Sequence, residues 1–262
     1  MVKFTHYLVT RFNVPVNNWN KDKSGHTTLD DAWMKHRLSL FNRYCVPTIR
    51  AQSEQEFQWI LYCDINTKPG DLLEIEKSVS DIHGASVRKV AHPDEMITDL
   101  KQLISFAATP YVITSRVDND DGLGNNYVKI IREHFKETDN VLLNFTGGIL
   151  YDLNKKVMTQ MKNSQWNHYT SLIEEKKSPE KLQTVLGFPH DNPPPDISIE
   201  NISSKGNWLK IIHERNVKSQ LKGKPLFHFN KNYFGGIAIK EFPLSIKNTI
   251  IYSFKRAMHK IN

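Results

Sequence analysis

Short apolar segments alternate with longer segments of helical period over residues 1–154, and this alternation restricts the fold more than any other feature of the sequence. A buried strand is typically an apolar run of about four to eight residues. Runs of this kind lie at 6–10, 57–63, 86–90, 111–117, 141–145 and 149–153. Strands that alternate with helices form a parallel sheet with the helices packed on its faces. The sequence therefore predicts an α/β fold with a mostly parallel central sheet flanked by helices.

The helical segments are marked by apolar residues three or four positions apart. The first carries Met34, Leu38 and Phe41, and Thr28 with Asp31 three residues later has the arrangement of a capping box at its start. The last predicted helix of the chain has one apolar face, made by Ile250, Phe254, Met258 and Ile261.

The alternation stops near Lys155. The segment that follows is polar and ends in a proline-rich stretch at 187–195, where three successive prolines exclude a regular helix or a central strand. We therefore expect the segment from Lys155 to Pro195 to be a loop, before one more strand at 208–213. At 262 residues the chain fits a single large domain.

The formal net charge of +7 has two interpretations. It reflects an excess of surface lysine, or it marks an anionic partner such as nucleotide phosphates, a phospholipid surface or nucleic acid. Nucleic acid is not expected, because the sequence has no zinc-finger spacing and no RNP-like motif. Peripheral contact of the basic surface with a membrane stays open.

The expected location is the cytoplasm. No apolar run approaches the ~18 residues that a membrane-spanning helix needs. The two cysteines, Cys45 and Cys63, each follow a tyrosine, and this setting favours buried thiols in a reducing compartment over a disulfide framework.

An acidic cluster directly after the strand at 111–117 carries the clearest chemical signal. It consists of Asp118, Asn119, Asp120 and Asp121. Parallel sheets bind ligands at the carboxyl ends of their strands. There, one carboxylate can accept hydrogen bonds from a ribose and another can ligate a divalent cation that bridges two phosphates. An oxygen-rich site suits Mg²⁺ or Mn²⁺. The plain alternative is a solvated acidic turn.

Four segments of the chain resemble successive blocks of the rhamnosyltransferase-like family. They are HYLVTRFNV, FNRYCVPTIRAQSEQEFQWILYCDINT, ITSRVDNDDGL and NWLKIIHERNV. The resemblance covers residues 1–150 and a block at 207–217. It implies a GT-A-like glycosyltransferase fold and transfer of rhamnose or another hexose from a dTDP- or UDP-sugar to a glycan, lipid-linked or other acceptor. Within one continuous GT-A-like domain, the loss of the strand-helix alternation near Lys155 predicts a nucleotide-sugar-binding half at 1–154 and an acceptor-side half at 155–262.

The resemblance assigns roles to three residues of this sequence. The DxD motif of such enzymes, which holds the donor and its Mn²⁺ or Mg²⁺, corresponds to Asp118 and Asp120. The late histidine that completes the metal ligands corresponds to His213, which ends the predicted strand at 208–213. The plain alternative for His213 is a capped residue at a strand end.

Further donor contacts are expected at the same edge of the sheet. Thr10 and Arg11 end the first strand, Asp64 ends the second, and Arg116 precedes the acidic cluster. Asp64 could accept the N3–H of uracil or thymine, and either arginine could contact the diphosphate through its fork of donors. Otherwise, Asp64 is an ordinary turn residue and the arginines pair with nearby carboxylates.

An inverting transferase also needs a base for the acceptor hydroxyl. Asp191, beside His190 in the proline-rich loop, is the first candidate, with Asp196 and Glu180 after it; a retaining mechanism needs none of them. We expect the segment 178–205 to be a lid that orders on the donor, and a plain disordered insertion is the alternative. Two other functions remain open: a nucleotidyltransferase, and a non-catalytic module that binds carbohydrate or nucleic acid.

Overall fold

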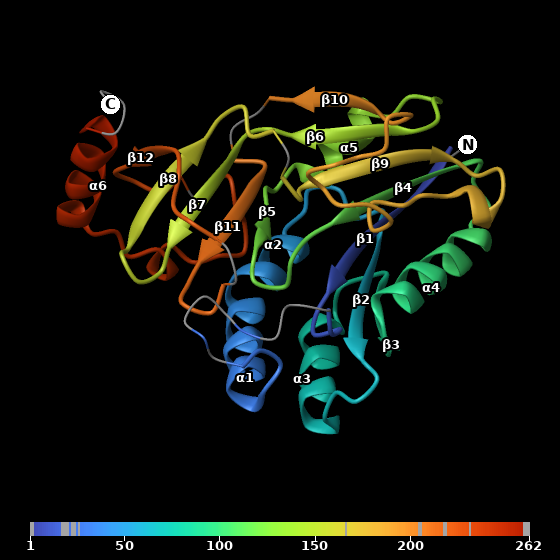
Figure 1. Cartoon of the computed structure of the whole chain (residues 1–262), viewed down its shortest axis with the longest axis horizontal. Coiled ribbons are helices and arrows are strands. Elements are labelled where there is room, and N and C mark those ends of the chain that lie inside the picture. Colours follow the sequence, from blue (N-terminus) through green and yellow to red (C-terminus); the bar gives the residue numbers. More distant parts are fainter. Residues whose placement is uncertain are drawn as a thin grey trace.

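The computed structural model describes residues 3–16, 21, 25, 27–165, 167–203, 206–216, 219–230 and 232–258. Two sheets lie side by side (Figure 1). The seven-stranded sheet has the order β10-β6-β9-β4-β1-β2-β3, and the five-stranded sheet has the order β12-β8-β7-β11-β5.

The strands are β1 (Phe4–Arg11), β2 (Gln58–Asp64), β3 (Ala85–Val90), β4 (Tyr111–Arg116), β5 (Gly122–Leu123), β6 (Val141–Phe145), β7 (Gly148–Asp152), β8 (Val157–Met161), β9 (Thr170–Glu175), β10 (Ser198–Ile202), β11 (Trp208–Ile212) and β12 (Lys224–Leu226). The α-helices are α1 (Asp31–Leu40), α2 (Val46–Arg50), α3 (Pro69–Val79), α4 (Pro93–Ser105), α5 (Tyr127–His134) and α6 (Ile246–Met258).

The predicted α/β fold with a mostly parallel central sheet is confirmed. Strand β1 lies between β2 and β4 and is parallel to both, and β3 continues the sheet in parallel beyond β2. At the carboxyl edge, Arg11 is opposite Tyr62 on β2, and Val9 is opposite Arg116 on β4. The ends of the strands near Thr10, Asp64 and Val117 therefore share one edge, as predicted.

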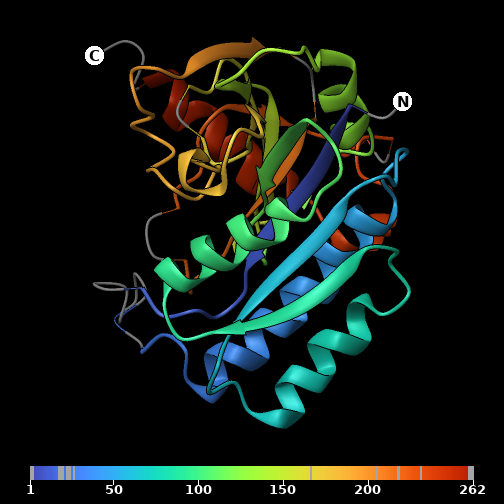
Figure 2. The same cartoon turned by 90° about the vertical axis from the view of Figure 1, so that its right-hand side faces the viewer.

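Side chains that alternate along the central strands fill two separate apolar layers. On β2, Trp59, Leu61 and Cys63 belong to the layer covered by α1, α3 and α5, whereas Ile60 and Tyr62 belong to the layer covered by α4. Figure 2 shows α4 on one face of the sheet and α1 with α3 on the other. Both faces are thus apolar, which explains why the predicted strands are nearly continuous apolar runs.

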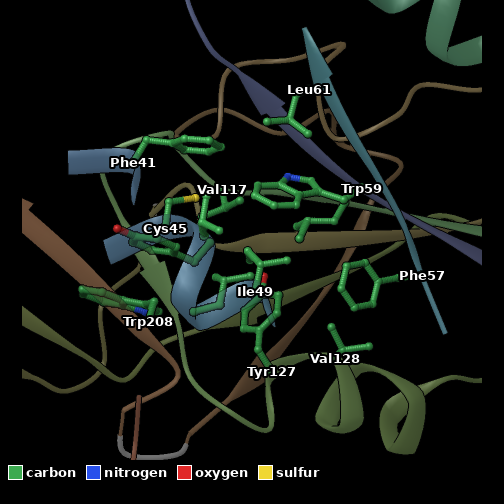
Figure 3. Packing of buried hydrophobic residues seen from close by; sticks show 14 of the residues in the cluster. Phe41, Cys45, Ile49, Phe57, Trp59, Leu61, Val117, Tyr127, Val128 and Trp208 are labelled. Carbon is green, nitrogen blue, oxygen red and sulfur yellow. The ribbon is translucent and has the colours of Figure 1, made fainter. Parts of the chain in front are cut away.

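The larger apolar layer surrounds the first helical segment (Figure 3). Phe41 and Trp59 pack with ring centroids 5.8 Å apart, and the Trp59 indole N–H donates to the Thr10 hydroxyl over 3.0 Å. Cys45 and Cys63 are free and buried, as predicted.

Helix α1 begins one residue after its cap, Asp30, whose carboxylate accepts the backbone N–H of Trp33 at 2.7 Å. The predicted capping box with Thr28 is therefore wrong, because the aspartate next to the helix takes that role. The helix then continues through a π-helical segment (Phe41–Cys45) into α2. The predicted apolar face, including Met34, is buried.

The structure corrects the expectation of a loop from Lys155 to the proline-rich stretch. Strands β8 and β9 both form there, and β9 lies in the main sheet, antiparallel to its neighbours β4 and β6. The position 154/155 is therefore not a boundary between the sheets: β9 and β10 join the seven-stranded sheet, while β5 and β7 belong to the other one. The division of the chain by role stays a prediction.

The segment 178–205 is anchored on both sides of its prolines. Leu182, Val185, Ile197 and Ile202 are buried, and β10 pairs with β6 in parallel. The lid stays a prediction, and these contacts confine it to the middle of the segment; residues 204 and 205 lie outside the described part.

The predicted C-terminal helix is α6, and Ile261 lies beyond the described residues. In the described part of the chain, no helix combines the length and the apolar character needed to cross a membrane.

Candidate active site

The acidic cluster forms the turn that carries the chain from β4 of the main sheet to β5 of the second sheet. The turn is closed by a hydrogen bond from the Asp121 N–H to the Asp118 carbonyl, at 3.1 Å. The amide of Asn119 donates to the Phe12 carbonyl over 2.7 Å, which ties the turn to the end of β1. One hydrogen bond within the turn and one to the residue that follows β1 therefore hold the carboxylates at the carboxyl edge.

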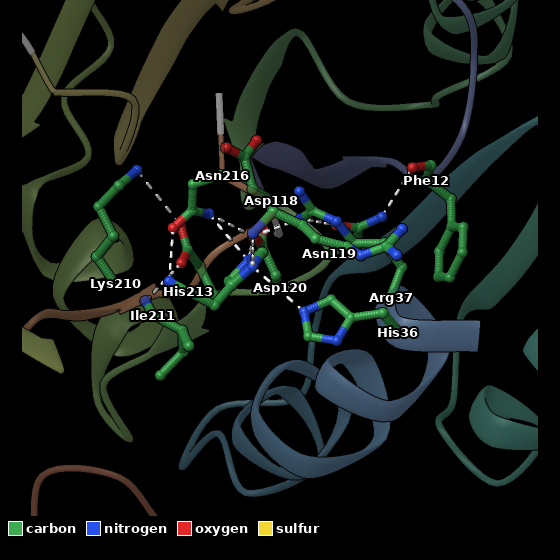
Figure 4. Close-up of polar contacts among 12 residues, drawn as sticks. Phe12, His36, Arg37, Asp118, Asn119, Asp120, Lys210, Ile211, His213 and Asn216 are labelled. Atoms are coloured by element: carbon green, nitrogen blue, oxygen red, sulfur yellow. Dashed lines mark hydrogen bonds and ion pairs between the residues drawn. The ribbon is translucent and has the colours of Figure 1, made fainter. Parts of the chain in front are cut away.

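Asp120 is buried, with 7% of its side chain exposed, and its Oδ2 atom has three donors (Figure 4). The Arg37 guanidinium on α1 forms an ion pair with it. His213 Nε2 lies 2.9 Å away and the Asn216 amide nitrogen 3.3 Å away. A buried carboxylate needs such partners because an unpaired charge away from water is costly.

These partners keep Asp120 ionised. Burial alone would raise the pKa of its carboxyl group, but the charge of Arg37 and the hydrogen bond with His213 outweigh burial and hold the pKa well below its usual range. Asp120 is thus an anion at neutral pH.

His213 has a partner on each ring nitrogen. Its Nδ1 lies 3.3 Å from Nε2 of His36 on α1, and it also accepts the backbone N–H of Arg215 at 3.2 Å. The latter contact favours the tautomer whose Nε2–H donates to Asp120. Coordination of a metal through Nε2 would require the other tautomer, in which the Nδ1–H of His213 donates to Nε2 of His36. His36 is therefore already placed to orient His213 for metal binding.

Asp121 is held from three sides. Its Oδ1 accepts the Ile211 N–H on β11 at 2.8 Å, and its Oδ2 accepts the Tyr169 hydroxyl at 2.7 Å and lies 3.2 Å from His168 Nε2. The Lys210 ammonium is 3.7 Å from the same oxygen. Asp121 therefore joins the two sheets as well as adding charge to the site.

Packing against Trp208 fixes the position of the Tyr169 phenol, which donates a hydrogen bond to Asp121. Tyr169 stacks on Trp208 with ring centroids 4.6 Å apart, and the Trp208 indole donates to the Phe145 carbonyl over 2.8 Å. A Cβ at position 148 would lie 2.0 Å from the indole, so Gly148 leaves the space that the ring fills. Burial, followed by the charge of Asp121, raises the pKa of Tyr169 well above its usual value, so its neutral hydroxyl is a donor.

Asp118 is the most accessible carboxylate of the turn, with 33% of its side chain exposed. Arg116 donates to it over 3.1 Å, and His168 Nε2 is 3.5 Å away. Burial would raise the pKa of Asp118, but these two groups, with Lys210 and Arg11 after them, hold it well below its usual range. The Arg11 guanidinium interacts electrostatically with both Asp118 and Arg116.

Two sets of residues have the chemistry of a divalent-metal site. Ligand atoms of Asp118, Asp121 and His168 all lie within 4.8 Å of one another. The pair expected from the sequence, Asp120 and His213, is also together, but Arg37 already neutralises that carboxylate. Two carboxylates and one imidazole form a mixed oxygen and nitrogen set, which fits Mn²⁺ better than Mg²⁺.

The remaining predicted donor residues differ in their access to the site. Thr10 is completely buried, and its hydroxyl is hydrogen-bonded to Trp59. Asp64 is partly exposed at the end of β2, where one carboxylate oxygen accepts the Asn66 N–H at 2.7 Å. The structure therefore brings Arg11, Arg116, Asp118, Asp120 and His213 together, with Asp64 two strands away from β4 on the same edge.

The proline-rich loop reaches the site through His190. The His190 ring lies 5.8 Å from the ring of His168, and its pKa is lowered by burial and by the nearby charge of His168. Its neighbour Asp191 is exposed. Asp196 has another role, since its carboxylate accepts the side-chain amides of Asn140 and Gln183 over 3.1 and 2.9 Å.

The sequence did not reveal several members of the site. His36 and Arg37 lie on α1, whose apolar period indicated only the buried face. His168 and Tyr169 precede β9, in the segment expected to be a loop. The segment TSLIEE after them has only two apolar residues and no alternation, so the local sequence carried no strand signal that would have drawn attention to this pair.

Comparison with known proteins gives one family and several distant structures. The family described as "Putative rhamnosyl transferase" matches residues 5–225. Residues 1–349 of Staphylococcus aureus TarS in complex with UDP-GlcNAc are 15% identical, with a TM-score of 0.45 over 82% of this chain and 60% of that one. HddC from Yersinia pseudotuberculosis is 12% identical, with a TM-score of 0.40 over 78% and 93% of the two chains.

The chain spans about 60% of the length of the TarS structure that it matches. None of the curated proteins matches it. The family match, by contrast, extends from β1 to β12 and includes the whole acidic turn together with its partners on α1, β9 and β11. The chain therefore belongs to the family of putative rhamnosyl transferases.

Proposed function

We propose that the chain is a metal-dependent glycosyltransferase that transfers rhamnose or another hexose from a nucleoside-diphosphate donor to a glycan or lipid-linked acceptor. One observation carries the proposal. In a chain of this family, an acidic turn at the carboxyl edge of a parallel sheet is surrounded by basic side chains from four different elements or their ends. These basic side chains are Arg11, Arg37, Arg116 and Lys210.

The balance of charge suits a diphosphate. Three carboxylates face four basic groups, a formal balance of +1, and a bound divalent cation would raise it to +3, so the site with its metal could accept a diphosphate. In sugar transfer the negative charge grows on the departing diphosphate. Fixed cations aimed at that position lower the barrier because they need no reorganisation. Arg116 and Arg11 are the proposed contacts, through paired N–H donors.

Mn²⁺ or Mg²⁺ is the proposed cofactor. When bound, it would act as a Lewis acid on the leaving diphosphate. Asp118 is the first candidate ligand, since it is the most exposed carboxylate of the turn and belongs to the set with Asp121 and His168. Asp120 and His213 are the alternative ligands, and they would require Arg37 to release Asp120.

The nucleotide base is proposed to be uracil or thymine, read by the free carboxylate oxygen of Asp64, which can accept the N3–H. Thr10 is not part of the proposal, because its hydroxyl is buried against Trp59. Asp191 is the proposed base towards the acceptor if transfer inverts the anomeric centre, since its neighbour His190 places the loop against the site. We further propose a cytoplasmic location with peripheral membrane contact.

The test measures nucleotide binding and turnover in the same preparation. Calorimetry with UDP and dTDP should show binding that depends on Mn²⁺, and Asp118→Asn should weaken it by about 1–2 orders of magnitude, since it removes one charged ligand. Asp94→Asn, an exposed carboxylate in the first turn of α4, is the matched control and should bind normally. Turnover of a nucleotide-sugar should release the nucleoside diphosphate.

Two results would refute the proposal. Release of pyrophosphate would identify a nucleotidyltransferase instead. Binding of nucleoside diphosphates that is equally strong with and without Mn²⁺, and that is unchanged in Asp118→Asn, would exclude a metal-dependent donor site at the acidic turn.

A further inference from the structure

Helix α6 turns its polar side towards the protein. Thr249 is its one buried residue, and the inward face is held by hydrogen bonds rather than by apolar packing. The Asn248 amide donates to the Lys155 carbonyl over 2.7 Å, and the Tyr252 hydroxyl donates to the Gly223 carbonyl over 3.3 Å. An amphipathic surface helix normally does the opposite and buries its apolar face.

The apolar face of α6 is consequently exposed. Its members, with their exposed fractions, are Ile246 (66%), Ile250 (41%), Ile251 (43%), Phe254 (68%) and Met258 (68%). Four of them are spaced by four residues, so they form one continuous stripe along the helix. A contiguous exposed apolar patch, unlike single exposed residues, marks a surface that contacts a partner or a membrane.

Basic side chains accompany this stripe. At 100° per residue, Lys247 falls between Phe254 and Met258 within the apolar arc, and Lys255 falls at its border. Figure 1 places α6 at the outer end of the molecule, beyond β12, where nothing in the described part of the chain covers it. The whole chain has a formal net charge of +7.

We propose that α6 docks on an anionic phospholipid surface and lies in the plane of the interface. A helix with isoleucine and phenylalanine on one side and lysine beside them binds in this way, with the apolar side chains between the headgroups and the lysines among them. The aliphatic stem of Lys247 can lie along the apolar stripe while its ammonium group reaches the phosphates.

The position of Lys247 argues against a second copy of the chain as the occupant. Two α6 helices paired through this stripe would bury both Lys247 side chains in a mainly apolar contact, and each ammonium would lose its water without gaining an opposite charge. A lipid surface supplies phosphates at the depth that the ammonium reaches. The membrane contact considered from the net charge alone thereby acquires a defined surface.

The test is sedimentation of the full chain with vesicles. Vesicles of phosphatidylcholine mixed with phosphatidylglycerol should bind the protein, and vesicles of phosphatidylcholine alone should bind it far more weakly. The double substitution Ile250→Ser with Phe254→Ser should lower the partition coefficient by about tenfold or more, because two anchoring side chains are lost. Lys247→Ala should lower it about fivefold on the anionic vesicles and less at high salt.

Phe106→Ser is the matched control. Phe106 is also an exposed aromatic residue, 77% exposed at the end of α4, and its replacement should leave vesicle binding unchanged. Circular dichroism should show that all the variants keep the fold, and vesicle binding is measured without nucleotide, so the result is independent of the proposed activity.

Three outcomes would overturn the proposal: no binding to the anionic vesicles, equal loss of binding in the Phe106→Ser control, or a concentration-dependent dimer that Phe254→Ser dissociates. The last outcome would assign the stripe to a second copy of the chain.

Discussion

Replacement of Arg37 by alanine separates the two candidate metal sites. The Arg37 guanidinium is buried, with 11% of its side chain exposed, and it pairs with Asp120 and donates to the Asn119 side-chain oxygen over 3.0 Å. It also lies over the Trp33 ring, 5.1 Å from the centroid. The substitution leaves the Asp120 carboxylate with His213 and Asn216 as its side-chain partners.

The expected cost follows from burial. Removing one partner of a buried ion pair destabilises a protein by about 3–5 kcal/mol. Because two other donors stay on Asp120, we expect the lower end, about 3 kcal/mol at pH 7. For a chain of this length, a loss of that size lowers Tm by about 6 °C.

Manganese should reverse part of this loss if Asp120 is a ligand. The freed Oδ2 atom would accept the cation, and a ligand present at about one hundred times its Kd stabilises the folded state by about 2.7 kcal/mol. Thermal unfolding with and without Mn²⁺, in the absence of nucleotide, measures this recovery. Calorimetry should show tighter Mn²⁺ binding to Arg37→Ala than to the unsubstituted chain.

Arg43→Ala is the matched control. Arg43 lies on the same helical segment, pairs with Glu241 and sits over the Tyr44 ring, but it is 44% exposed. We expect a loss below about 1 kcal/mol and no change in Mn²⁺ affinity. If Arg37→Ala loses stability without binding Mn²⁺ more tightly, Asp120 is not a ligand and the Asp118 set remains. A loss as small as that of the control would contradict the buried ion pair itself.

Three further predictions concern strand β9, the residue before it and the proline-rich loop. Tyr169→Phe removes the hydroxyl that donates to buried Asp121 and keeps the stacking on Trp208, so urea unfolding should show a loss of about 1.5–3 kcal/mol. Burial raises the pKa of Glu174 to about 7, above its value in the unfolded chain. Its contribution to stability is therefore present at acid pH and is lost as the pH rises from about 4.5 through 7, a change on the order of 3 kcal/mol that Glu174→Gln should abolish in unfolding measured against pH. Asp191→Asn should lower kcat while leaving donor Kd unchanged, and UDP with Mn²⁺ should protect the loop 187–195 from limited proteolysis; equal cleavage in both conditions would leave an ordinary loop and remove Asp191 as base.

Local pattern was sufficient for the first half of the chain. Strands β1, β2 and β3 are each followed by a helix before the next strand, and β2, β3 and β4 all join the sheet in parallel, with β4 beside β1. The carboxyl ends of β1, β2 and β4 then have to meet at one edge. The placement of Arg11, Asp64 and Asp118 at that edge could therefore be predicted without any knowledge of tertiary contacts.

The failure after Lys155 has a definite cause. Strand β9 is polar at several positions and runs antiparallel between β4 and β6, so it forms by pairing with segments already separated in the chain. The position of β9 depends on β4 and β6, and the spacing of apolar residues within 155–195 does not indicate which strands it will pair with. His168 and Tyr169 reach the acidic turn only because β9 enters the sheet at that place.

The sequence by itself thus determined the order of the main strands and helices over residues 1–154, the acidic turn at a ligand edge and the amphipathic character of α6. Only the tertiary structure decided that Arg37 pairs with Asp120, that His36 contacts Nδ1 of His213 and that the apolar face of α6 is exposed. The physical reason is that a period describes the faces of one element. Which residues pack against a given face of a helix or strand depends on the register and packing of residues far away in the chain. The local pattern does not indicate these contacts.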